Sequence, residues 1–202
     1  MLKVNNLNFS YNRGKPVINN VSLEIKAADF IGIIGPNGSG KTTLLKLLSG
    51  LLQSDSGEIL VKNKSLHSYS VYELAKLRAF VPQENHLEFD FSVEEIVWMG
   101  RSPYADLWGI EKGKDKVEQA LQNCELLELK NRNARTLSGG EWQRVVLAKA
   151  LVQDTEIIML DEPTHFLDIY YQLQSLRKLK ELNRAGKTII AVFHDLNLAA
   201  MF

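Results

Sequence analysis

The sequence predicts an α/β fold with a mostly parallel sheet, an N-terminal antiparallel β subdomain and an inserted helical subdomain. Three observations support this prediction. Apolar strand patterns alternate with helical patterns, the strand patterns disappear between Gln83 and Thr136, and a glycine-rich loop joins a strand to a helix at residues 35–43. Strands that alternate with helices favour a parallel sheet with helices on its faces.

The first part of the chain contains most of the strand patterns and the first helix. Strand patterns occur at residues 2–11, 17–25, 29–35 and 57–63. From Lys41 the apolar spacing becomes that of a helix, which continues to residue 52 and ends at the turn QSDSG. A second helix is predicted at residues 70–78, and a strand follows at 79–83.

The middle of the chain, residues 84–153, is predicted to be a helical subdomain. Ser92 is followed three positions later by Glu95, which is the pattern of a capping box at the start of a helix. Residues 112–129 form a longer helical stretch that contains Cys124, the one cysteine of the chain. This cysteine is predicted to be a small core residue, and a chain without a cysteine pair suits a reducing cytosol.

Strand and helix patterns alternate again after the helical subdomain. A strand is predicted at residues 156–160, a helix around 168–184, a strand at 187–193 and a last helix that begins near Asp195. Residues 1–202 are therefore expected to form one domain, with a core from residues 1–83 and 154–202 and the helical subdomain between them. The last helix would have about seven residues and no glycine to end it, so we expect a chain that is truncated at its C-terminus.

The composition is that of a soluble globular protein, with 45% hydrophobic and 24% charged residues. Lys plus Arg and Asp plus Glu both total 24, and no long basic run occurs, so no nucleic-acid partner is expected. The N-terminus lacks the apolar block of a signal peptide, and the longest apolar runs, such as residues 188–193, are only as long as a strand. If the protein works at a membrane, another chain provides the passage.

The loop GPNGSGKTT matches the phosphate-binding pattern G-x-x-x-x-G-K-[ST] and lies between a strand and a helix. The alternative is a turn that contains glycines by chance, but the full match in this context favours the phosphate loop. Its glycines allow backbone angles that side chains would block, and amides from Gly38 to Thr42 would face phosphate oxygens. Lys41 would neutralise the β- and γ-phosphates, and the Thr42 hydroxyl would bind magnesium. The predicted nucleotide-binding residues here are Gly35, Pro36, Asn37, Gly38, Ser39, Gly40, Lys41, Thr42 and Thr43.

An acidic pair, Asp161 and Glu162, ends the apolar strand pattern in IIMLDEP. A strand that is buried on both faces is expected to carry polar residues only at its end, where ligands bind to α/β sheets. Asp161 would hold magnesium through Thr42 and water, and Glu162 would act as the general base on the attacking water. The alternative is a pair of solvated carboxylates that begin a turn, but the phosphate loop upstream favours the catalytic interpretation.

A second glycine pair occurs in LSGGEWQ, residues 137–143, which contains no lysine. Gly139 and Gly140 lead into a helical pattern, so free amides at the helix N-terminus would face an anion. A tight turn capped by Ser138 is the alternative, and these residues alone favour it.

The motifs follow one order along the chain, namely the phosphate loop, Gln83 after a strand, LSGGEWQ, IIMLDEP, FLD and His194 after a strand. In this order the sequence resembles the ATP-binding subunits of ABC transporters over essentially the whole chain. The resemblance implies a P-loop NTPase core and two domains that pack head to tail, so that the signature of each completes the phosphate site of the other. Ser138, Gly139 and Gly140 would then bind the γ-phosphate held by the partner's Lys41.

The resemblance also implies roles for four single residues. Tyr11 matches the aromatic residue that stacks on adenine, and Gln83 matches the glutamine that reaches magnesium and the attacking water. Asp168 matches the aspartate that crosses the dimer axis, and His194 matches the histidine that hydrogen-bonds the γ-phosphate. Each has a local alternative: a strand-end tyrosine, a surface glutamine, a helix N-cap and an exposed histidine. The sequence departs from the usual family pattern at Glu141, His165 and Phe166.

A separate ATPase chain resembles an importer subunit, because exporters of this family usually carry the ATPase fused to a membrane domain. The stretches FSVEEIVWMGRSPY and EPTHFLDIYYQ most resemble ATPases that serve the uptake of iron-siderophores, haem and cobalamin. The resemblance implies ATP hydrolysis with magnesium that powers such an importer. It also implies a homodimer, bound to integral membrane permease subunits at the cytoplasmic face of the inner or cell membrane.

Other functional classes would need different sequence features. A soluble ATPase of the same superfamily that acts on DNA or ribosomes would need a coiled-coil insertion, tandem domains or basic arms. A GTPase would need N-K-x-D, and the only NK, at residues 63–64, is followed by Ser65 and Leu66. A truncated form that binds nucleotide without hydrolysing it is a further alternative.

Overall fold

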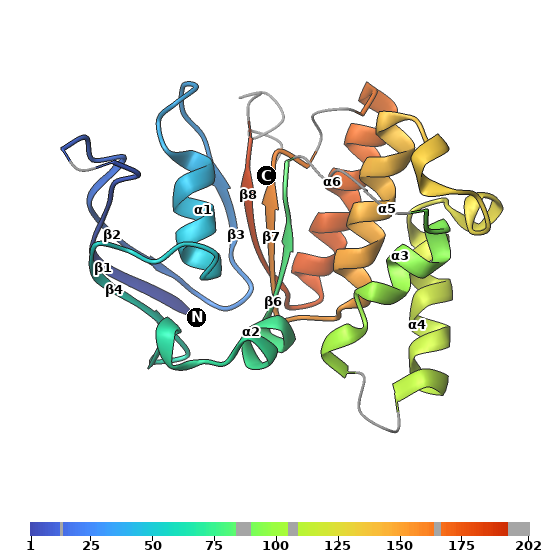
Figure 1. Ribbon diagram of the computed structural model, residues 1–202, viewed down its shortest axis with the longest axis horizontal. Helices are drawn as coiled ribbons and strands as arrows, with labels where there is room; N and C mark the ends of the chain where they lie inside the picture. Colours follow the sequence, from blue (N-terminus) through green and yellow to red (C-terminus); the bar gives the residue numbers. More distant parts are fainter. Residues whose placement is uncertain (13, 84–89, 105–108, 164–166, 194–202) are drawn as a thin grey trace.

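The computed structural model describes residues 1–12, 14–83, 90–104, 109–163 and 167–193, and in the fourth range the side chains from residue 113 on. Two four-stranded sheets and the helices packed on them make up this part of the chain (Figure 1). The antiparallel sheet lies on one side of the molecule, the parallel sheet in the middle, and the helices α3 to α6 on the other side (Figure 1). The predicted fold class is confirmed.

The N-terminal sheet is antiparallel and has the strand order β2-β1-β4-β5. Its strands are β1 (Leu2–Phe9), β2 (Ile18–Ile25), β4 (Ser56–Val61) and β5 (Lys64–Ser65). In β1 the buried positions change from even to odd numbers, with Val4 buried before the change and Leu7 after it. The register shifts between these two residues, where Asn6 has φ 48°. This bulge keeps the apolar side chains of β1 on the core face.

The central sheet is parallel and has the strand order β3-β8-β7-β6. Its strands are β3 (Phe30–Ile33), β6 (Arg78–Val81), β7 (Ile157–Asp161) and β8 (Thr188–Val192). The strand β7 is buried along its whole length because both of its faces are covered. Met159 packs with α1 and the antiparallel sheet, whereas Ile158 and Leu160 pack with the helices on the opposite face.

The helices are α1 (Lys41–Ser49), α2 (Val71–Leu77), α3 (Val93–Met99), α4 (Gly109–Asn123), α5 (Gly139–Val152) and α6 (Ile169–Arg184). Short 3-10 helices occur at Leu66–Ser68, Ser102–Tyr104, Leu127–Leu129 and Ala134–Thr136. The capping box predicted at Ser92 is present at the start of α3: Ser92 Oγ accepts from the amide of Glu95, and the Glu95 carboxylate accepts from the amide of Ser92. Within the described part of the chain, no helix is long and apolar enough to span a bilayer.

The helical region shares a core with the parallel sheet. Val97 of α3, Leu121 of α4 and Val145 of α5 belong to the same buried cluster as Leu160 of β7. Cys124 lies in this cluster, as predicted for a small core residue, and burial raises the pKa of its thiol to about 12. The division into a core of residues 1–83 and 154–202 and a helical subdomain of residues 84–153 stays a prediction.

Several element boundaries differ from the predicted ones for local reasons. The first helix ends at Ser49 rather than at residue 52, because Gly50 adopts a left-handed conformation (φ 75°) and closes the helix. The predicted helix 112–129 starts earlier and ends at Asn123, before Glu125 at φ 54°, with a separate 3-10 turn after it. The helix predicted near Asp195 lies outside the described residues.

Candidate active site

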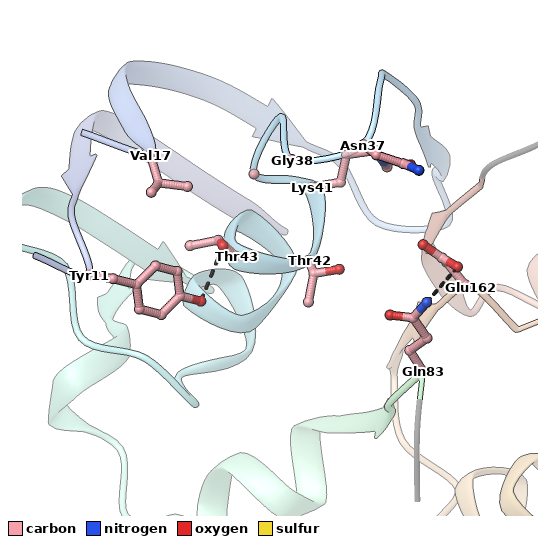
Figure 2. Close-up of a pocket in the computed structure, with 10 residues that line it drawn as sticks. Tyr11, Val17, Asn37, Gly38, Lys41, Thr42, Thr43, Gln83 and Glu162 are labelled. Atoms are coloured by element: carbon pink, nitrogen blue, oxygen red, sulfur yellow. Dashed lines mark hydrogen bonds between the residues drawn. The ribbon is translucent and has the colours of Figure 1, made fainter. Parts of the chain in front are cut away.

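A cavity of about 480 Å³ opens between the antiparallel sheet and the carboxyl ends of the parallel strands. Figure 2 shows Tyr11 and Thr43 at one side of it, Gln83 and Glu162 at the other, and Lys41 and Thr42 between them. Ligands of open α/β sheets bind at this edge of the strands. The cavity is lined by Tyr11, Val17, Asn37, Gly38, Gly40, Lys41, Thr42, Thr43, Gln83 and Glu162.

The glycine-rich loop connects β3 to α1 and turns sharply where α1 begins. Gly40 is the N-cap of α1 with φ 90°, and a Cβ at this position would lie 3.1 Å from the carbonyl oxygen of Val17. A side chain here would therefore be strained and crowded, which explains the glycine. The loop brings the amides at the N-terminus of α1 to the cavity, where they can bind an anion.

Lys41, the first residue of α1, is buried and holds the loop from inside. Its Nζ donates hydrogen bonds of 3.0 Å to the carbonyl oxygens of both Gly35 and Pro36. These two residues therefore contribute to the loop through their carbonyls, and the described lining of the cavity does not include them. The ammonium group is fixed at the cavity wall, where it can neutralise phosphate oxygens.

Thr42 and Asp161 join the phosphate loop to the end of β7. The Thr42 hydroxyl donates a hydrogen bond of 2.9 Å to Oδ1 of Asp161. Asp161 is only 1% exposed, and burial raises the pKa of its carboxyl group. The Thr42 hydrogen bond opposes this shift, the charge of Glu162 adds to it, and Lys46 and Lys41 lower the pKa again. The result is a desolvated carboxylate next to a hydroxyl, which is a pair of oxygen ligands of the kind that magnesium prefers.

Gln83 and Glu162 meet at one side of the cavity, where two neighbouring strands end. Gln83 follows β6 and Glu162 follows β7, and Nε2 of Gln83 donates a hydrogen bond of 2.8 Å to Oε2 of Glu162 (Figure 2). Glu162 is buried and has φ 52°, a left-handed conformation that costs roughly 1–2 kcal/mol for a residue with a side chain. Strained residues of this kind cluster at functional sites. A carboxylate held in this way can accept a proton from a water molecule in the cavity.

Tyr11 lies at the opposite rim, where the residue is 58% exposed. The ring packs edge-on against Phe9, and the hydroxyl lies 3.2 Å from Oγ1 of Thr43. These contacts fix an aromatic face at the entrance to the cavity, and a planar group such as a nucleobase can stack on it.

The second glycine pair starts α5 and is not part of the cavity lining in this chain. Ser138 is the N-cap, and its Oγ accepts a hydrogen bond of 3.3 Å from the amide of Glu141, while the Glu141 carboxylate accepts from the amide of Ser138. The local alternative, a capped turn, is therefore present. Ser138 and Gly139 are exposed, and Figure 1 shows that α5 begins at the same end of the molecule as the phosphate loop.

Two further predicted residues, Asp168 and His194, lie away from the cavity lining or outside the described chain. Asp168 is the N-cap of α6, where its Oδ1 accepts a hydrogen bond of 3.0 Å from the amide of Tyr171. The local alternative, a helix N-cap, is therefore present at Asp168. Its side chain is exposed and can also contact another molecule. His194, together with His165 and Phe166 of the unusual loop, lies outside the described residues.

Sequence reasoning missed two residues of the site. Val17 lines the cavity and packs over Gly40, and no local pattern marks it. Gln143 is 5% exposed and donates a hydrogen bond of 3.2 Å to the carbonyl oxygen of Pro163, directly after Glu162. The available signal was a polar residue among the apolar positions of a helix, because a buried amide group requires a partner.

The comparison with known proteins places this geometry among ATP-binding cassettes. A sequence model of the family described as ABC transporter matches residues 18–165. The uncharacterized ABC transporter ATP-binding protein YvrA of Bacillus subtilis is 45% identical over 192 residues, which cover 92% of this chain and 43% of that protein. The hemin import ATP-binding protein HmuV of Escherichia coli O157:H7 is 41% identical, over 100% of this chain and 80% of its own length. The chain thus spans less than half of the B. subtilis relative.

Solved structures have the same fold. The dimeric post-hydrolysis state of the ATP-binding cassette MJ0796 bound to ADP and Pi superimposes with a TM-score of 0.90 at 32% identity, over 98% of this chain and 90% of that one. An inward-facing transporter assigned to the metal-chelate type has a TM-score of 0.81 at 31% identity, over 98% of this chain and 74% of that one.

Proposed function

Because this chain belongs to the ATP-binding family of ABC transporters, we propose that it is the ATP-hydrolysing subunit that powers an ABC importer. The hydrogen bond between Thr42 and Asp161 carries this proposal. It joins the phosphate loop to the end of β7. Lys41, Thr42 and Glu162 line the same cavity there, so that the groups for binding and for hydrolysis face the same space.

ATP binds with its phosphates on the loop and its base at the rim. The amides at the start of α1 and the Lys41 ammonium group hold the β- and γ-phosphates. Tyr11, whose exposed ring lines the opposite side of the cavity, stacks on the adenine. Stacking uses only the π-face of a base, so this contact discriminates weakly between nucleotides.

The oxygen atoms of Thr42 in α1 and Asp161 at the end of β7 fit magnesium. Thr42 and Asp161 would hold the ion, together with Gln83 from the end of β6, and the remaining positions would be filled by phosphate oxygens and water. When bound, the ion neutralises charge on the transferred phosphoryl group. The raised pKa of Asp161 fits this role, because a buried carboxylate without a cation is poorly compensated.

Glu162 acts as the general base. Its carboxylate accepts the proton of the water whose oxygen attacks the γ-phosphorus, and the bond to the β-γ bridging oxygen breaks. Gln83, which contacts this carboxylate at 2.8 Å, orients the base and the water. His194 is assigned to the γ-phosphate by its place in the motif order, after the strand β8.

We assign the second half of each site to a second copy of this chain. Ser138, Gly139 and Gly140 are exposed or half-exposed at the start of α5, and the helix N-terminus there can bind the γ-phosphate held by the partner's Lys41. Asp168, which is exposed at the start of α6, faces the dimer axis in this arrangement. The dimeric relative with bound ADP and Pi supports a paired cassette.

The proposed cargo is a metal chelate such as an iron-siderophore, haem or cobalamin. The similarity to a hemin import ATPase and to a metal-chelate type transporter supports this class. The subunit would then bind integral membrane permease subunits at the cytoplasmic face of the membrane.

Two measurements test the proposal. Steady-state phosphate release should require both ATP and magnesium and should stop when EDTA is added. Crosslinking in membranes should capture a polytopic permease. A chain that hydrolyses ATP but never crosslinks to a membrane protein would be a soluble ATPase instead, and a chain that binds ATP without releasing phosphate would contradict the enzymatic part of the proposal.

A further inference from the structure

Gln143 is a polar residue on the buried side of α5. It is 5% exposed, and its neighbours Val145 and Val146 belong to the main apolar core. Its Nε2 donates a hydrogen bond of 3.2 Å to the main-chain carbonyl oxygen of Pro163. Burial of an amide group is unfavourable unless the group is hydrogen-bonded, so this bond is retained as long as the helix is packed.

The bond acts on the turn that carries Glu162, because Pro163 is the next residue. Glu162 has φ 52°, and a residue with a side chain keeps this conformation only where the surrounding structure fixes it. Before the turn, Asp161 is paired in register with Val192 of β8. After the turn, the Pro163 carbonyl is fixed by Gln143. The strained residue is therefore held from both sides.

We propose that Gln143 is a positioning residue for hydrolysis, which acts through the Pro163 carbonyl to hold the Glu162 carboxylate at the attacking water. This inference rests on the proposed function, in which Glu162 is the base. A base must lie within hydrogen-bond reach of its water, and a displacement of about 1 Å can lower a rate by roughly 100-fold. The described lining of the cavity does not include Gln143, so the nucleotide contacts remain when its amide is removed.

The variant Gln143→Met tests the role, because methionine has similar length but no donor. We expect kcat for ATP hydrolysis to fall roughly 5- to 50-fold, while the Kd for ATP stays within about two-fold. The matched control is Gln153→Met at the other end of α5. There the Gln153 Nε2 donates to the carbonyl oxygen of Arg78 at 2.9 Å, so the same chemistry is removed far from the turn. This control should lose stability without losing kcat.

A double-mutant comparison shows whether Gln143 acts through Glu162. In a Glu162→Gln background, Gln143→Met should lower the single-turnover rate by less than about two-fold, because the base it positions is already absent. The inference would be overturned if Gln143→Met lowered the single-turnover rate in the Glu162→Gln background by the same factor as in the parent. An equal loss of kcat in Gln143→Met and Gln153→Met would also overturn it. If Gln143→Met does not fold, Gln143→Leu gives the same comparison.

The test separates this inference from the proposed function. A parent chain that does not hydrolyse ATP contradicts the proposed function and removes the base that Gln143 would position. A parent chain that hydrolyses ATP at the same rate as Gln143→Met contradicts only the positioning role.

Discussion

The Thr42 hydroxyl donates a hydrogen bond of 2.9 Å to the buried carboxylate of Asp161, across 119 positions of the sequence. Thr42 lies in the first turn of α1, and Asp161 is the last residue of β7. One bond thus connects α1, the helix proposed to bind phosphate, to the end of the strand β7. Because the carboxylate is desolvated there, we expect its charge to lower the stability of the protein without ligands, which leads to the first prediction.

Asp161→Asn should raise the thermal midpoint of the nucleotide-free protein in EDTA at pH 7, although it should reduce magnesium-dependent hydrolysis. Burial raises the pKa of Asp161 above its unfolded value, so the folded state holds the proton more tightly. Stability then falls as pH rises from the ordinary aspartate pKa through the raised one, and the charge remains unfavourable above it. Asparagine keeps an acceptor for Thr42 and removes this charge.

Asp154 provides the opposite control. Burial alone would raise the pKa of this carboxyl group, but the hydrogen bonds and the charges of Lys116 and Lys187 together lower it. Asp154→Asn should therefore lower the thermal midpoint at pH 7. If both variants shift the midpoint in the same direction, the charge argument for Asp161 is wrong.

Glu162→Gln should lower steady-state phosphate release by roughly two to four orders of magnitude, because it keeps the shape of the side chain but removes the base. ATP binding should remain, and an ATP-bound dimer should accumulate in size-exclusion chromatography. Glu156→Gln is the control, since Glu156 precedes the same strand at its far end and forms an exposed ion pair with Lys62. Near-parental hydrolysis by Glu162→Gln would exclude it as the base.

Lys41→Ala should weaken ATP binding roughly 10- to 100-fold in calorimetry, because a charged donor to the phosphates is lost. The same change removes two bonds to the carbonyls of Gly35 and Pro36, so the loop itself should loosen. Lys3→Ala, at an exposed position of β1, should leave the affinity unchanged. Equal affinity of Lys41→Ala and the parent would refute the assignment of the phosphate loop.

Tyr11→Ala should weaken the binding of ATP and GTP alike, by about 1–3 kcal/mol, because stacking does not depend on the identity of the base. Tyr11→Phe keeps the ring and should bind both nucleotides nearly as the parent does. Tyr72→Ala, at a tyrosine that is 70% exposed on α2, serves as the control. A loss that affects ATP alone would indicate a base-specific contact instead of stacking.

Ser138→Arg should abolish hydrolysis while the monomer still binds ATP within a few-fold of the parent affinity, because Ser138 lies outside its own cavity lining. A mixture of Ser138→Arg with Lys41→Ala contains heterodimers with one doubly altered site and one intact site. This mixture should recover ATP-dependent dimerisation, which neither variant shows alone, in light scattering. Loss of ATP binding by the Ser138→Arg monomer would mean that Ser138 serves its own chain's site.

The fold and the phosphate loop could be predicted because their signals are local. A continuous apolar run predicted the strand β7, and the pattern G-x-x-x-x-G-K-[ST] predicted the loop that ends in Lys41 and Thr42. Helix ends were less accurate, since Gly50 and Glu125 terminate helices through left-handed conformations that apolar spacing does not reveal.

Contacts between distant segments could not be predicted from local patterns. Arg144 of α5 stacks on the ring of Tyr171 of α6 at 4.3 Å and donates to the carbonyl of Glu125 at 3.2 Å, which connects these two helices to the turn after α4. The bond from Gln143 to Pro163 is of the same kind. At Ser138 the sequence allowed both a cap and an anion site, and one chain can display only the cap.

The helix α5 begins beside Ser138 and carries Gln143 in its second turn, about 7 Å along its axis. In the proposed head-to-tail pair, ATP on one chain's loop would contact the neighbour's Ser138, and that neighbour's Gln143 would position the carboxylate that serves the other nucleotide. Each nucleotide would therefore help to position the catalytic base of the site that it does not occupy. Neither ATP would be hydrolysed until both sites had bound ATP.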